Sequence, residues 1–194
     1  MRVEAGELER VIILCPPRHG KSLTSTIFFP AWYLGRNPDK YVISASYGQE
    51  LAEDFGAKVR NHLLDPLHRT VFPKSILSAD SQAKDKFTTT EGGMYFAVGR
   101  GSAIVGRGAH LLLVDDPVKT REEASSETLR RQLHDWFADV AYTRLMPGKS
   151  AVVLTQTLWH EDDLAGWIMR EQQHDGWHVV RFPAIAEEDE PWRK

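Results

Sequence analysis

CPPRHGKS (residues 15–22) follows a short apolar run, and its interpretation decides the fold of the whole chain. A phosphate-binding loop ordinarily reads G-x-x-x-x-G-K-[ST]. Gly20, Lys21 and Ser22 match the end of that pattern, whereas Cys15 stands in place of the first glycine and two prolines follow it. On its own the stretch leaves two interpretations open: a variant phosphate loop, or a GKS that merely begins a helix.

The second half of this stretch carries the groups that a phosphate requires. Backbone N–H groups and the first turn of the following helix surround the anion in such loops. Gly20 lets the backbone approach a phosphate closely, Lys21 would contact the β- and γ-phosphates, and the Ser22 hydroxyl would bind Mg²⁺. Proline has no N–H, but the donors lie after the two prolines. The candidate nucleotide-binding residues are Pro17, Arg18, His19, Gly20, Lys21, Ser22 and Leu23.

Composition and patterning suit one α/β domain. The chain has 194 residues, is 42% hydrophobic, carries a formal net charge of −3 and has a single cysteine, so an intrachain disulfide is excluded. Its polar start and its short apolar runs predict neither a signal peptide nor a membrane helix. Several runs are rich in Val, Ile and Leu, which is typical of strands buried on both faces of a parallel sheet. We expect strands at 11–15, 41–46, 110–116, 151–157 and 178–183, helices at 21–34, 49–65, 123–145 and 161–173, and a β-hairpin over 86–98 that turns at Glu91-Gly92-Gly93.

The second half of a nucleotide site is indicated by LLLVDD (residues 111–116), an apolar strand that ends in two carboxylates. Asp115 would hold Mg²⁺ opposite Ser22. Asp116 stands where many P-loop ATPases carry a glutamate that orients the attacking water, so it is the candidate catalytic base. The alternative is a surface turn ended by Pro117. Two motifs in this order, each leaving a strand, favour a working site.

A third polar group ends the next apolar run, AVVLTQT (residues 151–157). Ligands of open α/β sheets bind at the carboxyl ends of strands. If this strand neighbours the other two, Thr155, Gln156 and Thr157 would sense the γ-phosphate and couple its loss to the rest of the domain. The alternative is that these are ordinary polar residues at the beginning of a loop.

Taken together, PPRHGKS, LLLVDDPVK and TQTLWHEDDLAG resemble the ATPase domain of bacteriophage large terminase subunits, the motors that package DNA into a procapsid. The resemblance runs almost end to end, through FPAWYLGRNPD (29–39) and FPAIAEEDEPWR (182–193). Loops of this family often lack the first glycine and carry an arginine before the GK, which here is Arg18. The resemblance therefore favours a variant phosphate loop.

The resemblance implies a P-loop NTPase fold with an additional catalytic strand, in which helices flank a mostly parallel central sheet and a small β-hairpin is added. Residues 1–183 would form the motor domain. Residues 184–194 would begin a linker to a C-terminal nuclease domain that this sequence lacks, so nuclease activity is not expected. The chain differs from the family pattern in two places. Relatives have a longer segment before the first strand, which helps hold the adenine, whereas this sequence has only ten residues before Val11. Leu158 stands where relatives commonly have arginine.

The implied activity is Mg²⁺-dependent ATP hydrolysis that drives double-stranded DNA, of any sequence, into a procapsid. The implied partners are the portal protein, the small terminase subunit and further copies in a ring on the portal, with a monomer in isolation. The implied location is the cytoplasm of the infected bacterium, at the procapsid portal vertex. Alternatives are a helicase-like translocase of the same fold and a nucleotide-gated binding module without hydrolysis, against which Asp116 argues. A small-molecule kinase is less favoured, because no arginine-rich lid is evident.

Two arginines are candidates for stabilising charge in the transition state, a role worth about 10³–10⁵ in rate where it has been measured. Arg18 lies in the loop and would act within its own subunit. Arg107, just before the strand of LLLVDD, would act on the nucleotide of a neighbouring subunit, and Arg100 and Arg144 are weaker candidates.

Other charged groups receive no functional assignment from the sequence. WHEDDL (159–164) lacks a second histidine at the spacing of a zinc helix, so a dedicated metal site is not favoured there. Basic residues that could contact DNA are scattered, and such short runs are usually solvated faces. They are Lys84, Lys86, Arg130, Arg131 and Lys149.

Overall fold

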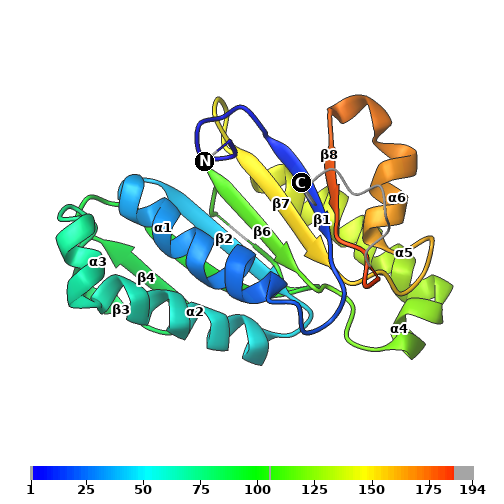
Figure 1. Cartoon of the computed structure of the whole chain (residues 1–194), viewed down its shortest axis with the longest axis horizontal. Coiled ribbons are helices and arrows are strands. Elements are labelled where there is room, and N and C mark those ends of the chain that lie inside the picture. Colours follow the sequence, from blue (N-terminus) through cyan, green and yellow to red (C-terminus); the bar gives the residue numbers. More distant parts are fainter. Residues whose placement is uncertain (1, 105, 186–194) are drawn as a thin grey trace.

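The computed structural model describes residues 2–104 and 106–185, which form one sheet with helices on both faces (Figure 1). The strands of this sheet are β1 (Arg10–Leu14), β2 (Tyr41–Ser46), β3 (Leu77–Gln82), β4 (Lys86–Thr89), β5 (Met94–Gly99), β6 (Leu111–Asp115), β7 (Ala151–Gln156) and β8 (His178–Arg181). Their order across the sheet is β3-β4-β5-β2-β6-β7-β1-β8. All pairs from β5 to β8 are parallel, whereas β4 and β3 add an antiparallel edge.

Helices of the first half of the chain cover one face of the sheet, and α5 and α6 pack on the other (Figure 1). Within the described ranges, no helix is long and apolar enough to cross a bilayer. The helical segments are η1 (Leu23–Phe28), α1 (Phe29–Arg36), α2 (Gln49–Leu64), α3 (Pro66–Val71), α4 (Arg121–Ser125), α5 (Glu127–Asp135), η2 (Trp136–Ala141), η3 (Tyr142–Arg144), α6 (Leu164–Glu171) and η4 (Gln173–Asp175).

Strand β6 shows why the central strands are apolar along their whole length. Every residue of β6 is buried. Leu111 and Leu113 pack into the core that contains α1 and α2, whereas Leu112 and Val114 pack into the core that contains α5 and α6. Because successive side chains point to opposite faces, a strand between two helical layers needs apolar residues at every position, odd and even alike.

The five strands predicted from apolar runs are confirmed, and none of their ends differs by more than two residues. The hairpin is confirmed as β4 and β5, but it is not a separate appendage, because β5 pairs with β2 inside the central sheet. Strand β3 was not predicted, because its sequence LSADSQ has no apolar run.

Two predicted helices differ from those observed. The segment 123–145 is divided at Ser126, whose hydroxyl accepts a hydrogen bond from Leu129 N at 3.4 Å and so begins a new helix, α5. This break was not predicted from the sequence. The segment 161–173 begins as a helix only at Leu164, because the Asp163 carboxylate caps α6 by accepting Gly166 N–H.

The order of the strands brings the three polar motifs together at the carboxyl ends of three neighbouring strands. Strand β7 lies between β1 and β6, with Leu14 paired with Gln156 and Asp115 paired with Thr155. The carboxyl ends of these parallel strands therefore meet. The sequence expectation that the third motif neighbours the other two is confirmed.

Candidate active site

Residues 15–22 leave β1 and turn sharply into the helix that begins at Lys21. Cys15 N–H donates to Gln156 O at 3.2 Å, which continues the pairing of β1 with β7. Arg18 and Gly20 have φ of 64° and 78°, in the left-handed region. Between them, His19 Nδ1–H donates to Pro17 O at 2.8 Å. These two left-handed residues, separated by His19, reverse the direction of the chain, so that Lys21 lies in the first turn of the helix.

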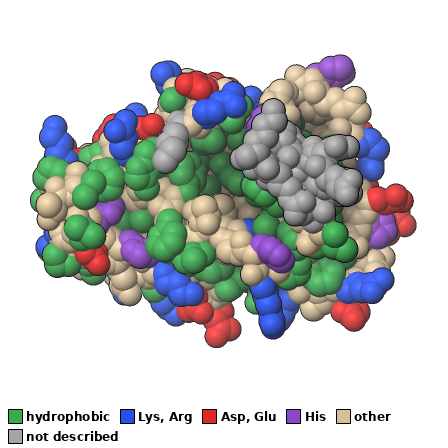
Figure 2. Space-filling view, viewed as in Figure 1, with side chains coloured by type: hydrophobic (Ala, Val, Ile, Leu, Met, Phe, Trp, Pro, Cys, Tyr) green, Lys and Arg blue, Asp and Glu red, His purple; other side chains and the backbone are tan. Residues whose placement is uncertain are grey.

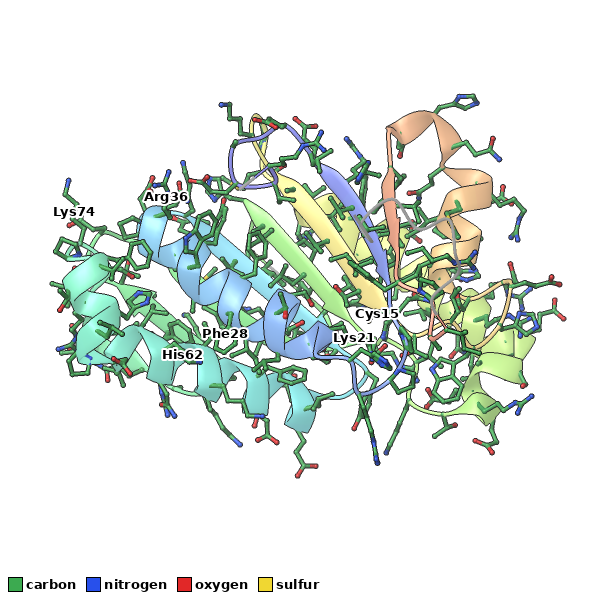
Figure 3. The ribbon with its side chains drawn as sticks, viewed as in Figure 1. Cys15, Lys21, Phe28, Arg36, His62 and Lys74 are labelled. Carbon is green, nitrogen blue, oxygen red and sulfur yellow. The ribbon has the colours of Figure 1, made fainter. Side chains whose placement is uncertain are left out.

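The Lys21 ammonium lies against the carboxylate that ends the LLLVDD strand. Its Nζ is 2.7 Å from Asp116 Oδ2, and the Lys21 side chain is only 8% exposed. The other oxygen, Asp116 Oδ1, accepts the backbone N–H of Thr157 at 2.8 Å. Figure 3 shows Lys21 beside Cys15, where the central strands end. Asp116 thus joins the loop to the end of β7.

The backbone of Asp116 is also constrained. Its φ is 39°, a left-handed conformation that aspartate tolerates better than most residues. Its N–H donates to Thr155 O at 2.8 Å, so the chain turns immediately after β6. This turn carries the Asp116 side chain to the loop and leaves Asp115 inside the sheet.

Asp115 is a buried carboxylate, only 1% exposed. Among the described residues, no group makes a hydrogen bond of ordinary geometry to either of its oxygens. Burial, together with the charge of the Asp116 carboxylate, raises the pKa of Asp115 to about 7. The neighbouring Ser22 hydroxyl, the Lys21 ammonium and the Thr26 hydroxyl oppose this rise in the pKa.

The surroundings of Asp115 fit a divalent cation. A carboxylate without a partner, beside a serine hydroxyl and close to a second carboxylate, is the oxygen-rich donor set that Mg²⁺ prefers. Sequence reasoning chose Ser22 and Asp115 but missed Thr26, which is 1% exposed and lies beside the same carboxylate. The spacing of four residues from Ser22 puts Thr26 on the same side of the helix and was the available signal.

The three residues of the Thr155–Thr157 motif divide between two locations. Thr155 pairs with Asp115 on the neighbouring strand, and the Thr157 amide binds Asp116. Gln156 lies on the opposite face, beside Asp163 at the start of α6. Burial raises the pKa of Asp163, and the Gln156 side chain is one of the groups that oppose this rise. The structure therefore brings two of the three residues to the loop and directs Gln156 toward α6.

A cavity of about 540 Å³ lies beside the loop. The loop and the first helical turn form one wall, and the strand end and segment after β8 form the other. This cavity provides room for a ligand that contacts Lys21. Its lining residues are Ile13, Cys15, Pro16, His19, Gly20, Lys21, Thr24, Ser25, Val180, Phe182 and Pro183.

The candidate arginines lie in different surroundings. Arg18 is exposed in the loop itself. Arg107 is far along the sheet, in a cavity at the amino ends of β2 and β5, with its guanidinium carbon 4.0 Å from the centroid of the Phe96 ring. The weaker candidates have partners within the chain: Arg100 pairs with Glu123 at 2.7 Å, and Arg144 donates to Ile104 O at 3.1 Å.

The acidic turn at 159–164 has structural partners. Asp162 pairs with Arg130 at 3.3 Å and with Arg170 at 2.7 Å, which joins α5 to α6. His160 Nδ1 accepts Asp162 N–H at 2.9 Å. Within the described residues, no three His, Cys, Asp or Glu side chains gather as a metal site would require.

The face that carries α1 and α2 has no single basic patch among its described side chains. Figure 2 shows Lys and Arg interspersed with Asp and Glu along the rim of this face. Lys84, one of the cations noted in the sequence, pairs with Glu53 at 2.7 Å. This face alone therefore does not indicate where a nucleic acid would bind.

Comparison with known proteins gives matches to one kind of protein. Residues 12–193 match the family model described as terminase large subunit, T4likevirus-type, N-terminal. The fold is similar to the large terminase of bacteriophage HK97, with a TM-score of 0.56 at 14% identity, over 96% of this chain and 37% of that chain. It is also similar to the large terminase of a thermophilic bacteriophage in complex with ATP-γ-S, with a TM-score of 0.52 at 10% identity, over 93% of this chain and 43% of that chain. No curated protein sequence matches significantly.

These matches confirm the fold expected from the motifs, the P-loop fold of large terminases. The chain spans less than half the length of either large terminase. Because the family model matches nearly the whole chain, the chain belongs to the family of T4-like-virus-type terminase large subunits, as their N-terminal domain.

Proposed function

We propose that this chain is the ATPase domain of a DNA-packaging motor and hydrolyses ATP in a Mg²⁺-dependent reaction. The observation that carries the proposal is the contact between Lys21 and Asp116 at the carboxyl ends of the central strands, with Asp115 buried behind it. The large terminase of the thermophilic bacteriophage, similar in fold, was solved with ATP-γ-S. Family membership and this constellation together support nucleotide hydrolysis over a purely structural role.

The proposed reaction begins with the release of Lys21. An incoming triphosphate competes with Asp116 for the ammonium, because phosphate oxygens carry more charge than one carboxylate. Asp116, freed from Lys21 but still held by the Thr157 amide, then orients the attacking water and accepts its proton. Asp116 then releases this proton to the departing γ-phosphate or to solvent, and Lys21 returns to the Asp116 carboxylate. The position of Lys21, on Asp116 or on the phosphate, thus reports the state of the nucleotide.

Mg²⁺ would be held by Ser22 and Asp115 and, when bound, would neutralise phosphate charge. Of the arginines, Arg18 would stabilise the transition state within its own subunit, or Arg107 would do so on a neighbour. Thr155 and Thr157 would couple hydrolysis to the sheet, because both contact the turn at Asp116. Gln156 would pass the movement to α6 through Asp163.

The work of the motor is proposed on the basis of the family. The chain would move double-stranded DNA of any sequence, with further copies in a ring on the portal protein and with the small terminase subunit as partner. It would be monomeric alone, and it would act in the cytoplasm of the infected bacterium at the procapsid portal vertex. Residues 186–194, most of the proposed linker, lie outside the described residues.

Hydrolysis measured against the concentration of the chain tests the proposal. With Mg²⁺ and with Lys21→Ala as the blank, we expect turnover above that blank. Specific activity that rises with concentration would assign the arginine role to Arg107 in trans, and constant specific activity would assign it to Arg18. Turnover no higher than in Lys21→Ala, together with no ATP binding, would contradict the proposed function.

A further inference from the structure

A second cavity, of about 460 Å³, opens at the opposite edge of the sheet from the phosphate loop. Tyr41 and Met94, the first residues of β2 and β5, line it, so it lies at the amino ends of these strands. The remaining lining comes from β4, from the turn at Gly92 and from residues 106–108. Since the phosphate loop follows the carboxyl end of β1, the two sites are separate.

The cavity lies on the face of the sheet opposite α1 and α2. Phe87 and Tyr95 alternate with Lys86 and Phe96 along β4 and β5, and the first two pack into the core beneath α2. Lys86, Thr88 and Phe96 therefore point to the face opposite α1 and α2, where they are only partly buried.

Two cations share this cavity without a carboxylate. The Arg107 guanidinium stacks on the Phe96 ring, with 4.0 Å from its central carbon to the ring centroid, and Lys86 lines the same cavity. Among the described residues, neither forms an ion pair, and no acceptor takes a hydrogen bond from Arg107. The closest acid in sequence to Tyr41 is Asp39, which pairs with Lys40 at 3.4 Å.

Unpaired cations at such a position need an explanation, because the chain has more acidic than basic residues, 27 against 24. Partly desolvated charges cost free energy unless they are paired. The guanidinium carbon lies over the Phe96 ring, and no described residue accepts a hydrogen bond from its N–H groups, so these donors are available to a tetrahedral oxyanion. Thr88 and Tyr41, which both carry hydroxyl groups, line the same cavity.

We propose that the Lys86–Arg107 cavity is a second phosphate-binding site, with Thr88 and Tyr41 as further donors. The ligand class is a phosphate ester or diester. Two sources exist if the proposed function is correct, on which this part of the inference rests: the backbone of duplex DNA, or the nucleotide held by a neighbouring copy. The binding of a phosphate group at this site does not depend on which source supplies it.

The direct test is a titration with inorganic phosphate, followed by the amide NMR signals of the ¹⁵N-labelled chain. The amide signals of Gly106 and Gly108 monitor binding in this cavity, and the amide signal of Gly20 monitors binding at the phosphate loop. We expect the signals of all three glycines to shift when phosphate is added. Lys86→Gln should weaken the response of the cavity about 10-fold, because a charge-assisted hydrogen bond is lost, and should leave the Gly20 response unchanged.

Lys84→Gln is the matched control for this titration. It removes the same charge two residues away, but Lys84 lies outside the cavity and pairs with Glu53. Its phosphate response should equal that of the wild type at both sites. Signals of Gly106 and Gly108 that do not respond to phosphate, or that respond equally in Lys86→Gln, would overturn the proposal.

Two further assays identify the source of the phosphate. If DNA supplies it, Lys86→Gln and Arg107→Gln should each reduce the salt dependence of duplex binding by about one counterion. If a neighbouring nucleotide supplies it, duplex binding should be unchanged and the rise of specific activity with concentration should disappear. Lys86→Gln that behaves like Lys84→Gln in both assays would also overturn the proposal. If the chain has no ATPase activity but its Gly106 amide signal still shifts when phosphate is added, only the proposed function is contradicted.

Discussion

At the scale of single residues, Asp115 and Asp116 show how neighbouring carboxylates acquire different properties. One ends a buried strand and the other turns out of it, so burial acts mainly on Asp115, while Lys21 and the Thr157 amide hold Asp116. Identical side chains are thereby given two roles, cation binding and water activation. The sequence indicates both carboxylates, and the turn at Asp116 explains their separation.

Asp116 is predicted to act in chemistry and not in binding. Asp116→Asn should reduce single-turnover ATP hydrolysis about 10²–10⁴-fold, because the amide cannot accept the proton of water. ATP affinity should be kept or increased, since Lys21 is no longer held by a carboxylate. Rapid-quench hydrolysis and calorimetric binding measure the two effects separately. Hydrolysis at the wild-type rate would show that another group activates the water.

Asp115 makes stability depend on pH in the absence of Mg²⁺. Its pKa is raised from 3.8 to about 7 in the folded chain, so the folded state holds this proton more tightly than the unfolded state. The contribution of this group to stability is therefore greatest below about pH 4 and is lost as pH rises to about 7.

Removing that charge should stabilise the chain at neutral pH. We expect Asp115→Asn to raise the free energy of unfolding by about 2–4 kcal/mol at pH 8, with no gain near pH 4. Urea unfolding at both pH values, in buffer with a metal chelator, measures this difference. A variant that is equally stabilised at both pH values would contradict the assignment, and hydrolysis should be lost in either case.

At the scale of elements, α2 lies very close to the segment between β3 and β4. A Cβ added at Gly56 would lie 2.1 Å from the Lys84 carbonyl oxygen, a backbone atom that cannot easily move away. The glycine thus sets the distance between α2 and the antiparallel edge of the sheet. That edge carries Lys86, so the packing of α2 also positions the second cavity.

This contact predicts the sign of a helix substitution. Helix propensity alone would make Gly56→Ala stabilising by about 1 kcal/mol. Because of the clash, we expect it instead to destabilise the fold by about 1–3 kcal/mol, as seen for overpacked sites. Urea unfolding compares it with Gly48→Ala, where an added Cβ would meet nothing within 4 Å. Stabilisation by Gly56→Ala would show that α2 can move away from the sheet.

At the scale of the whole molecule, the strand order explains how far the sequence could predict the site. Runs such as LLLVD identify strands, and polar residues at their ends predict where a ligand binds, because parallel carboxyl ends share one edge. Alternation along β7 would also have predicted that Gln156 faces away from Thr155. Both predictions depend only on local pattern.

Other features depend on contacts that no local pattern reveals. Strand β3 is polar and forms by pairing with β4, so its sequence gives no signal. The left-handed φ of Arg18 is imposed by the turn into the helix and not by the residue type. The position of Arg107 on Phe96 requires the loop after β5 to fold back over the sheet. These are tertiary effects, which override local preference.

Calorimetry of ATP binding in the presence of Mg²⁺, to the wild-type chain and to Lys21→Ala, tests whether residues 15–22 bind phosphate. We expect one ATP bound per chain, with affinity reduced at least about 10-fold in the variant, because a charge-assisted contact to phosphate is lost. Equal affinity in the two proteins, or no binding by the wild type, would contradict the claim that residues 15–22 are a working phosphate loop.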